Sequence, residues 1–249
     1  MTTSTTIRPM AYTDMPILHG DWDKFADDRH THLKRLGNVI YLQPGFFRNE
    51  DVKQLQNRKL IGLTAVDSTT DEIMGSCSLW FVGFQPEEVP WTEPGPEPES
   101  EIRWCEENAK ILAELNAQPV DEARKEANAM IDSLDAMEDK DMKYWQSVLM
   151  PPGSKCIVVS GFSVLPQYRH KGVGGALLKW GTDQADRFGV HMWVHSSEAA
   201  VKAYSNAGFN VVGELDVDMD KYAPGPPPEG VDVPWGHYII RYMKRLPKE

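Results

Sequence analysis

Three closely spaced glycines form the clearest candidate binding site in the sequence. Gly172, Gly174 and Gly175 follow a basic run over residues 169–171 and stand between an apolar run and a helical pattern. Glycine lets a backbone approach a ligand closely, and the first turn of a helix presents unpaired N–H groups at its positive dipole end. The spacing therefore predicts a site for an anion such as a pyrophosphate.

Two common phosphate motifs do not fit this turn. A Walker-type loop needs GxxxxGK[ST], and no Lys-Ser or Lys-Thr pair follows the glycines. The dinucleotide fingerprint GxGxxG needs glycine or alanine at position 177, where Leu177 stands. Two interpretations of the glycines remain. They bind a different phosphate ligand, or they form a tight strand-to-helix turn that binds nothing.

The turn resembles motif A of the GNAT acetyltransferases, which binds acyl-CoA. The match consists of Arg169-x-x-Gly172-x-Gly174 and the preceding run over residues 164–168. At the expected distance follows a second element, similar to the A…Y…GF element of that family: Ala200, Tyr204, Gly208 and Phe209. The resemblance covers about residues 156–210. It implies an α/β GNAT fold, a mixed central β-sheet flanked by helices, and an enzyme that is an acetyl-CoA-dependent N-acetyltransferase.

The resemblance also implies which residues bind acetyl-CoA, the cosubstrate. Backbone amides of the glycine turn would hold the pyrophosphate, and main-chain N–H groups at the end of the preceding strand would face the pantetheine arm and the thioester carbonyl. The residues concerned are Phe162, Val164, Arg169, His170, Lys171, Gly172, Val173, Gly174, Gly175 and Ser197. Ser197 stands where the family often has asparagine.

Tyr204 matches the tyrosine that many family members use as a general acid. A departing thiolate with a pKa of about 8.5 can take a proton from a phenol with a pKa of about 10. Packing on the apolar face of a helix is the alternative role for this side chain. Of these two roles, we expect Tyr204 to act in catalysis.

The base that removes a proton from the acceptor amine is harder to identify. An alkylamine has a pKa of about 10 and is mostly protonated at neutral pH. Ser160, His191 and His195 are candidates, and we favour His195 because it ends a strand beside the expected cleft, although a structural role is the alternative. The four carboxylates over residues 214–220 share one strand face, which is either solvated or a wall that recognises cations.

Hydrophobic periodicity predicts the elements that position these residues. Strands are expected over residues 5–10, 60–66, 73–84, 156–165, 190–194, 211–219 and 237–243. An amphipathic stretch from Thr13 or Asp14 toward Leu36 includes Trp22 and Phe25 among its apolar points. Further helices are expected over 102–112, 123–134, 173–188 and 198–207, with Asp121 as a cap. This alternation predicts an α/β sheet of mixed direction.

The excess of acidic over basic side chains comes from one internal stretch. The net charge is −11, and residues 85–150 hold 17 of the 37 acidic side chains but only six of the 26 basic ones. Five prolines over 86–98 exclude a helix there. We expect a single GNAT domain over residues 1–249, with a Pro-rich and acidic helical insertion over 85–150. Aromatic side chains could line an acceptor pocket or belong to the core: Trp80, Phe81, Phe84, Trp91 and Trp104.

Composition also limits the partners and the compartment. Net negative charge argues against nucleic acid and against an anionic membrane surface, and no apolar run approaches the roughly 20 residues of a membrane span. Cys77, Cys105 and Cys156 have no metal-ligand spacing, and we expect reduced, mostly buried thiols in a cytoplasmic protein.

The function expected from the sequence is direct transfer of an acetyl group from acetyl-CoA to a primary amine, most simply that of a small molecule. A protein or peptide N-acetyltransferase is one alternative, and a non-catalytic acyl-CoA-binding module is another. The sequence leaves open whether the protein forms a homodimer.

Overall fold

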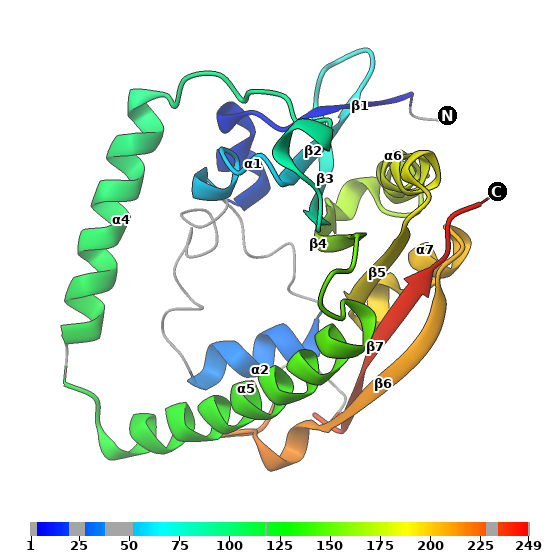
Figure 1. Ribbon diagram of the computed structural model, residues 1–249. Coiled ribbons are helices and arrows are strands. Elements are labelled where there is room, and N and C mark those ends of the chain that lie inside the picture. The colour runs from blue at the N-terminus through cyan, green and yellow to red at the C-terminus, as the bar shows by residue number, and fades with distance from the viewer. Residues whose placement is uncertain (1–3, 20–27, 38–51, 118, 228–233, 249) are drawn as a thin grey trace.

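A seven-stranded mixed sheet organises the computed structural model, which describes residues 4–19, 28–37, 52–117, 119–227 and 234–248 (Figure 1). The strands are β1 (Thr5–Pro9), β2 (Leu60–Asp67), β3 (Ile73–Val82), β4 (Cys156–Val164), β5 (His191–Ser196), β6 (Asn210–Asp218) and β7 (His237–Arg245). They lie in the order β1-β2-β3-β4-β5-β7-β6. All neighbours pair antiparallel except β4 and β5, which are parallel, so the predicted mixed α/β sheet is confirmed.

Helices cover both faces of this sheet (Figure 1). The described helices are α1 (Met15–His19), α2 (Arg29–Gly37), α4 (Glu99–Ala117), α5 (Glu122–Leu149), α6 (Val173–Phe188) and α7 (Val201–Asn206). Of these, α4 lies away from the sheet (Figure 1). The helix predicted over 173–188 coincides with α6. The one predicted over 198–207 is a 3-10 turn followed by the shorter α7. Trp22 and Phe25, expected in the first amphipathic stretch, lie outside the described residues.

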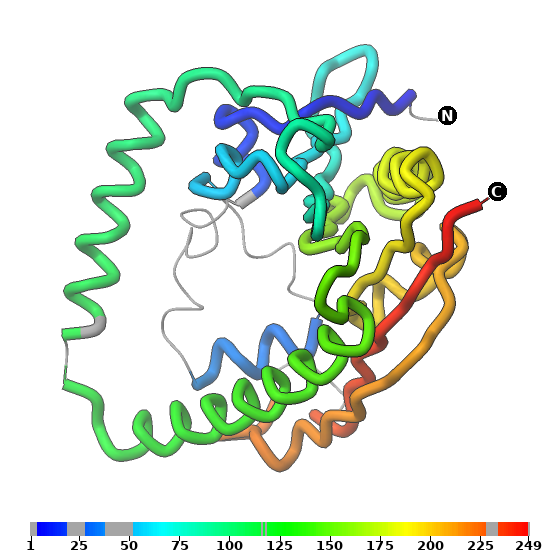
Figure 2. The backbone as a smooth tube through the Cα atoms, viewed as in Figure 1, coloured from blue at the N-terminus to red at the C-terminus, as the bar shows by residue number. Residues whose placement is uncertain are grey.

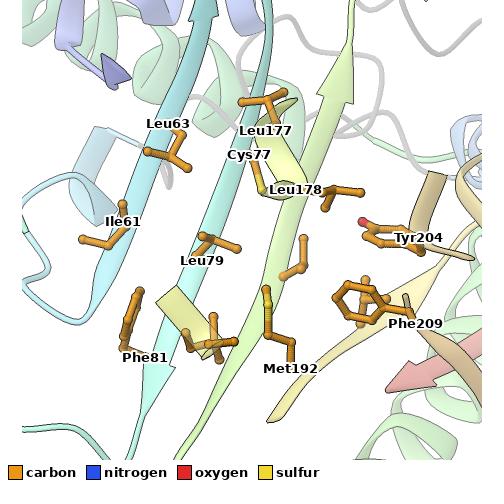
Figure 3. Close-up of a cluster of buried hydrophobic side chains, with 14 of the residues drawn as sticks. Ile61, Leu63, Cys77, Leu79, Phe81, Leu177, Leu178, Met192, Tyr204 and Phe209 are labelled. Atoms are coloured by element: carbon orange, nitrogen blue, oxygen red, sulfur yellow. The ribbon is translucent and has the colours of Figure 1, made fainter. Parts of the chain in front are cut away.

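One face of the sheet packs against α6 and α7 through the largest buried cluster. Leu177 and Leu178 of α6 meet Leu79 of β3 and Met192 of β5, all of them fully buried. Figure 3 shows this cluster, with Tyr204 and Phe209 at its side. Burying side chains of this size contributes about 1.5–3 kcal/mol each, so this layer fixes α6 firmly against the strands.

The opposite face packs against α5, the long helix of the acidic segment. Its N-cap is Asp121, as predicted, because the carboxylate accepts a hydrogen bond from Arg124 N at 2.8 Å. Ile131 is fully buried among residues of α2, β6 and β7. Further along, Trp145 stacks on Tyr242 of β7 with ring centroids 5.0 Å apart. The outer face of α5 is acidic, and its inner face belongs to the core.

The acidic segment leaves and rejoins the sheet at adjacent points. Val82 at the end of β3 pairs with Cys156 at the start of β4, so the chain between them returns to where it began. Figure 2 shows α4 and α5 as two long arms of this excursion. Two antiparallel strands that would otherwise form a hairpin are therefore joined by helices, which fits the interpretation of residues 85–150 as an insertion.

The state of the cysteines and the length and polarity of the helices can be compared with the sequence analysis. Cys77 and Cys156 are buried, Cys105 is half-buried, and none forms a disulfide, as predicted. Within the described ranges, every helix is too short or too polar to cross a bilayer.

Candidate active site

β4 and β5 part halfway along their length, and this gap is where the site lies. Their parallel pairing ends at Val159 and Val194. Just beyond, the register of β4 on β3 shifts so that Ser160 is an extra residue, which makes a β-bulge. A bulge bends its strand away from a neighbour. The bulge at Ser160 therefore opens a gap between the second half of β4 and β5.

Backbone groups of β4 face this gap. Leu165 donates its N–H to Met74 O on the β3 side at 2.9 Å. Successive residues of a strand point their N–H and C=O groups to alternate sides, so Val164 and Phe162 present theirs to the side away from β3. Consistently, Val164 O accepts a hydrogen bond from Arg169 Nε at 3.3 Å. The backbone groups of the two residues predicted to face a pantetheine arm therefore point into the gap.

The glycine turn forms the N-terminus of α6. Gly172 is the N-cap residue with φ of 88°, and His170 has φ of 61°. Both values lie in the left-handed region, which glycine adopts freely and histidine adopts more often than most residues do. The first helical hydrogen bond runs from Ala176 N to Gly172 O at 3.0 Å. The amides of residues 173–175 therefore have no partner within the helix.

The surroundings of these amides suit an anion. A side chain added at Gly172 or at Gly175 would meet nothing within 4 Å, so both glycines border open space. Lys171 and Gly172 are exposed, and the Lys171 ammonium lies 5.5 Å from the centre of the Tyr168 ring. The turn thus combines unpaired N–H groups, room and positive charge, which is the chemistry that a pyrophosphate needs.

A pocket of about 230 Å³ occupies the gap between β4 and β5. Its walls come from both strands and from residues on either face of the sheet: Asp28, His30, Val159, Ser160, Gly161, Phe162, Val194, His195, Ser196, Ser197, Ala200, Tyr204, Tyr238 and Ile240. Four residues predicted for the site, Phe162, His195, Ser197 and Tyr204, thus share one pocket. The glycine turn lies outside its lining.

Tyr204 stands on the α6 and α7 side of the pocket. Only 3% of the residue is exposed, and its ring contacts Phe162 and Phe209 at centroid distances of 5.3 and 5.5 Å. Figure 3 shows its oxygen on the side of Leu178. Burial, with a smaller effect of Cys77, raises the pKa of Tyr204 well above 10, so the phenol keeps its proton at neutral pH. A protonated phenol is a proton donor.

His195 stands on the α5 side of the same pocket. It is exposed to the cavity, and its ring lies 5.3 Å from that of Tyr242. The protein around the ring displaces water and lowers the pKa of His195 to about 4, so the ring is neutral at pH 7. The two other candidate bases are engaged elsewhere. His191 is hydrogen-bonded to Leu149 O at 2.9 Å, and Ser160 donates to Ser78 O at 3.3 Å.

A further wall of the pocket comes from the start of α2 and was not predicted. His30 stacks on Tyr238 at 5.0 Å, and its Nε2 lies 2.5 Å from Glu138 Oε1 of α5. Tyr238 donates its hydroxyl hydrogen to Asp28 Oδ1 at 2.8 Å. His30 and Glu138 are 108 residues apart, so no local spacing could have joined them. The only signal in the sequence for this wall of the pocket was that His30 follows closely after Asp28, the residue that caps α2.

Other groups singled out in the sequence lie away from the pocket. Phe81 and Phe84 are fully buried core residues, and Trp91 lines a separate hollow of about 190 Å³ beside β1 and β2. The carboxylates over residues 214–220 pair with neighbours on β7, in the turn before β7 or in the turn after β6, as with Glu214 and Arg241 at 2.9 Å. These pairs fit a solvated, internally neutralised face better than a wall for cations.

Comparison with known proteins agrees with this geometry. The sequence profile of the acetyltransferase (GNAT) family matches residues 41–209, which is more than half of the chain. No curated protein sequence matches. Among solved structures, mosquito arylalkylamine N-acetyltransferase like 5b superposes with a TM-score of 0.52 at 15% identity, over 98% of this chain and 100% of that one.

A second similar structure is that of histone acetyltransferase HPA2 and related acetyltransferase from Corynebacterium glutamicum, with a TM-score of 0.49 and 16% identity over 99% of this chain and 98% of that one. At 15% identity the mosquito structure shows a shared fold and no more. Together with the profile match over residues 41–209, the splayed strands and the glycine turn, it leads to one conclusion. The chain belongs to the GNAT family of acetyltransferases and is an acyltransferase.

Proposed function

We propose that this protein transfers the acetyl group of acetyl-CoA to the primary amine of a small molecule. The observation that supports it best is the pocket at the β4 bulge, which joins a proton donor, Tyr204, on one side of the sheet to His30 and His195 on the other. A donor could enter along the glycine turn and an acceptor from the opposite side. The two substrates would then meet between the strands.

The proposed acetyl-CoA site is built mainly from backbone. The amides of the turn from Lys171 to Gly175 would hold the pyrophosphate, with Arg169 and His170 alongside. The N–H groups of Phe162 and Val164 would face the pantetheine arm and the thioester carbonyl, where a hydrogen bond stabilises the negative charge that develops on the oxygen. Ser197 lies close by on the pocket wall. When bound, acetyl-CoA supplies the activated acyl group.

The catalytic roles proposed for side chains follow from their protonation. Tyr204 would give its proton to the departing thiolate, since its phenol is protonated at neutral pH, but its raised pKa makes it a weaker donor than a free phenol. His195 has a free lone pair at neutral pH, but its lowered pKa makes it a weak proton acceptor for an amine. His195 therefore stays a candidate for orienting the acceptor as well as for removing its proton.

The size and charge of the pocket favour a small cationic acceptor. About 230 Å³ is below the roughly 300–1,000 Å³ of typical ligand pockets, which leaves little room beyond the reacting groups. Asp28 lies on the wall, and the carboxylate of Glu138 lies just behind His30. Negative charge at this distance stabilises an ammonium group in a partly desolvated site. A cytoplasmic location stays a prediction, and a homodimer stays open.

The acceptor class can be tested by release of free thiol from acetyl-CoA. We would compare polyamines, arylalkylamines and amino sugars with lysine-rich peptides at equal amine concentration. We expect turnover of at least one class of small amine and little turnover of the peptides. Preference for the peptides would favour the protein-acetyltransferase alternative, and no amine-dependent release at all would contradict the proposed function.

The cosubstrate site can be tested separately by binding. Gly175 borders open space, so Gly175→Glu should fold while placing a carboxylate beside the proposed pyrophosphate. We expect it to weaken CoA binding by 10-fold or more, since like charges at about 4 Å repel by several kcal/mol at an effective dielectric of about 20. Gly175→Gln, of equal size but neutral, is the matched control. Equal affinity of the two variants would contradict the assignment.

A further inference from the structure

A histidine and a glutamate from distant parts of the chain form a pair on the acceptor side of the pocket. His30 Nε2 lies 2.5 Å from Glu138 Oε1, and only 15% and 12% of the two side chains are exposed. The ring of His30 also stacks on Tyr238 at 5.0 Å, with 22° between the ring planes. Two contacts therefore fix the ring, one in its plane and one on its face, while it lines the pocket.

Glu138 is itself held in its ionised form. Its second oxygen accepts a hydrogen bond from Lys34 Nζ at 2.6 Å, and Lys34 also pairs with Asp135 at 2.7 Å. Burial alone would raise the pKa of Glu138, but the hydrogen bonds from His30 and Lys34 and the charge of Lys34 outweigh it. The pKa ends below its usual value. The carboxylate is therefore an acceptor at neutral pH.

This pairing decides which nitrogen of His30 is available for chemistry. A carboxylate can only accept, so Nε2 must carry the hydrogen that lies between it and Glu138. In the neutral ring the lone pair is then on Nδ1. No hydrogen bond to Nδ1 is seen among the described residues. The arrangement matches the general pattern of a base oriented by a third group.

The neighbouring groups are less suited to this role. Asp28 Oδ2 accepts from Thr31 N at 3.0 Å, and Oδ1 accepts from Tyr238, so its oxygens are already engaged in capping α2. His195 has no carboxylate bonded to its ring among the described residues. The other ionisable groups nearby are Tyr238 on β7, which stacks on His30, and Lys34 on α2, which bonds Glu138 and pairs with Asp135 on α5; Asp141 on α5 acts on His195.

We propose that His30, oriented by Glu138, is the base that takes the proton from the acceptor amine. The proposal rests on the proposed acetyl transfer. The ammonium form of the acceptor gives one proton to Nδ1 of His30, and the freed lone pair forms the new N–C bond. The C–S bond breaks, the thiolate receives the proton of Tyr204, and the new amide nitrogen loses its second proton to water. Tyr204 regains a proton from solvent and His30 returns its own, so one proton is released per acetylated ammonium.

The proposal gives the acidic segment a place in the active site. Glu138 belongs to α5, within residues 85–150, and acts through His30 as a positioning residue. The carboxylates on the outer face of α5 are solvated, but the carboxylate of Glu138 faces inward, between α2 and the sheet. The segment would therefore orient a catalytic group as well as cover the sheet.

The test compares four variants of the full-length protein with wild type on the best amine found. The variants are His30→Gln, His30→Ala, Glu138→Gln and Glu138→Asp. We expect His30→Gln to lower kcat about 100-fold or more with little change in the KM for acetyl-CoA, and to abolish the acidic limb of the kcat/KM profile. Added imidazole should restore part of the activity of His30→Ala. Glu138→Gln should lower kcat, and Glu138→Asp should retain more activity than Glu138→Gln.

His237→Gln is the matched control, because His237 also pairs with a carboxylate, Asp216 at 2.7 Å, but on the exposed outer side of β7. It should behave as wild type. CoA binding and thermal unfolding of each variant separate loss of folding from loss of catalysis. If folded His30→Gln keeps the wild-type kcat and pH profile while the wild type acetylates amines, the role of His30 is wrong and the proposed function stands. If the wild type releases no thiol with any amine, both are overturned.

Discussion

The ring of Phe162 on β4 lies against Gly174 in the first turn of α6, since a Cβ placed on Gly174 would stand 2.9 Å from Phe162 Cζ. The same ring contacts Tyr204 at 5.3 Å. One side chain therefore joins the proposed anion site to the proposed general acid. Any residue larger than glycine at position 174 must push this ring toward Tyr204, so the turn and the pocket cannot change independently.

The first prediction concerns this contact. Gly174→Ala should lose about 1–2 kcal/mol of stability relative to Gly175→Ala, because only the former inserts a methyl group against a packed ring. Both variants gain the same helix propensity, so the comparison isolates the clash. Thermal unfolding measures the difference, and kcat should fall only in Gly174→Ala. Equal stability and equal kcat would show that Phe162 moves without consequence.

The second prediction concerns Tyr204 as a proton donor. Tyr204→Phe removes one oxygen and keeps the ring contacts with Phe162 and Phe209. We expect kcat to fall about 100-fold, with CoA affinity unchanged, since general acid catalysis contributes about 10²–10⁴-fold. Tyr144→Phe, at an exposed position of α5, is the control. A Tyr204→Phe enzyme with wild-type kcat would assign Tyr204 to packing.

The third prediction is a pH dependence of stability caused by His195. Its pKa is lowered from 6.5 to about 4 in the folded state, chiefly by burial. Between these values the unfolded chain binds more protons than the folded one, so His195 makes the protein less stable as pH falls from about 6.5 to 4. Above pH 6.5 it contributes no pH dependence.

His195→Gln should therefore lose less stability than wild type over that acidic window. Denaturant unfolding of both proteins at several pH values between about 4 and 7.5 gives the comparison, in which all other titrating groups cancel. The curves should run parallel above pH 6.5 and diverge below it. Parallel curves throughout would mean that solvent in the pocket keeps the ring close to its usual pKa.

The half of the candidate site around the glycine turn could be predicted because the residues that form it are close together in the sequence. The glycine turn, the strand before it and Tyr204 lie within about 50 residues, and their spacing fixes their order along one strand-turn-helix unit. The boundaries of α6 followed from periodicity, and in the structure Gly172 and Gly189 cap its two ends in left-handed conformations. Residues whose role depends on backbone geometry leave such signals in a sequence.

The acceptor half could not be predicted in the same way. His30 and Glu138 meet only because α2 packs along α5, and that packing depends on apolar residues such as Leu33 and Ile131 that look alike in any amphipathic helix. Nothing local distinguishes Glu138, which pairs with His30, from the other 16 acids of residues 85–150. Long-range pairing of common residue types has no spacing rule.

The fourth prediction tests whether the position of α5 matters for the acceptor. Trp145 lies flat against Gly213 of β6, where an added Cβ would be 1.8 Å from Trp145 Cζ2. Gly213→Ala must displace the indole and with it the C-terminal half of α5, at a cost of about 3 kcal/mol. Because Glu138 lies two turns before Trp145 on the same helix, the KM or kcat for the amine should change while CoA affinity does not.

Gly225→Ala is the matched control for that substitution, since a Cβ at Gly225 would meet nothing within 4 Å. It should leave unfolding and kinetics unchanged. In Gly213→Ala, a loss of stability with unaltered amine kinetics would mean that α5 docks independently at its two ends, with Lys34 alone sufficient to hold Glu138 beside His30. A joint loss of stability and amine turnover would mean that the packing of one indole on one glycine sets the geometry of the acceptor side.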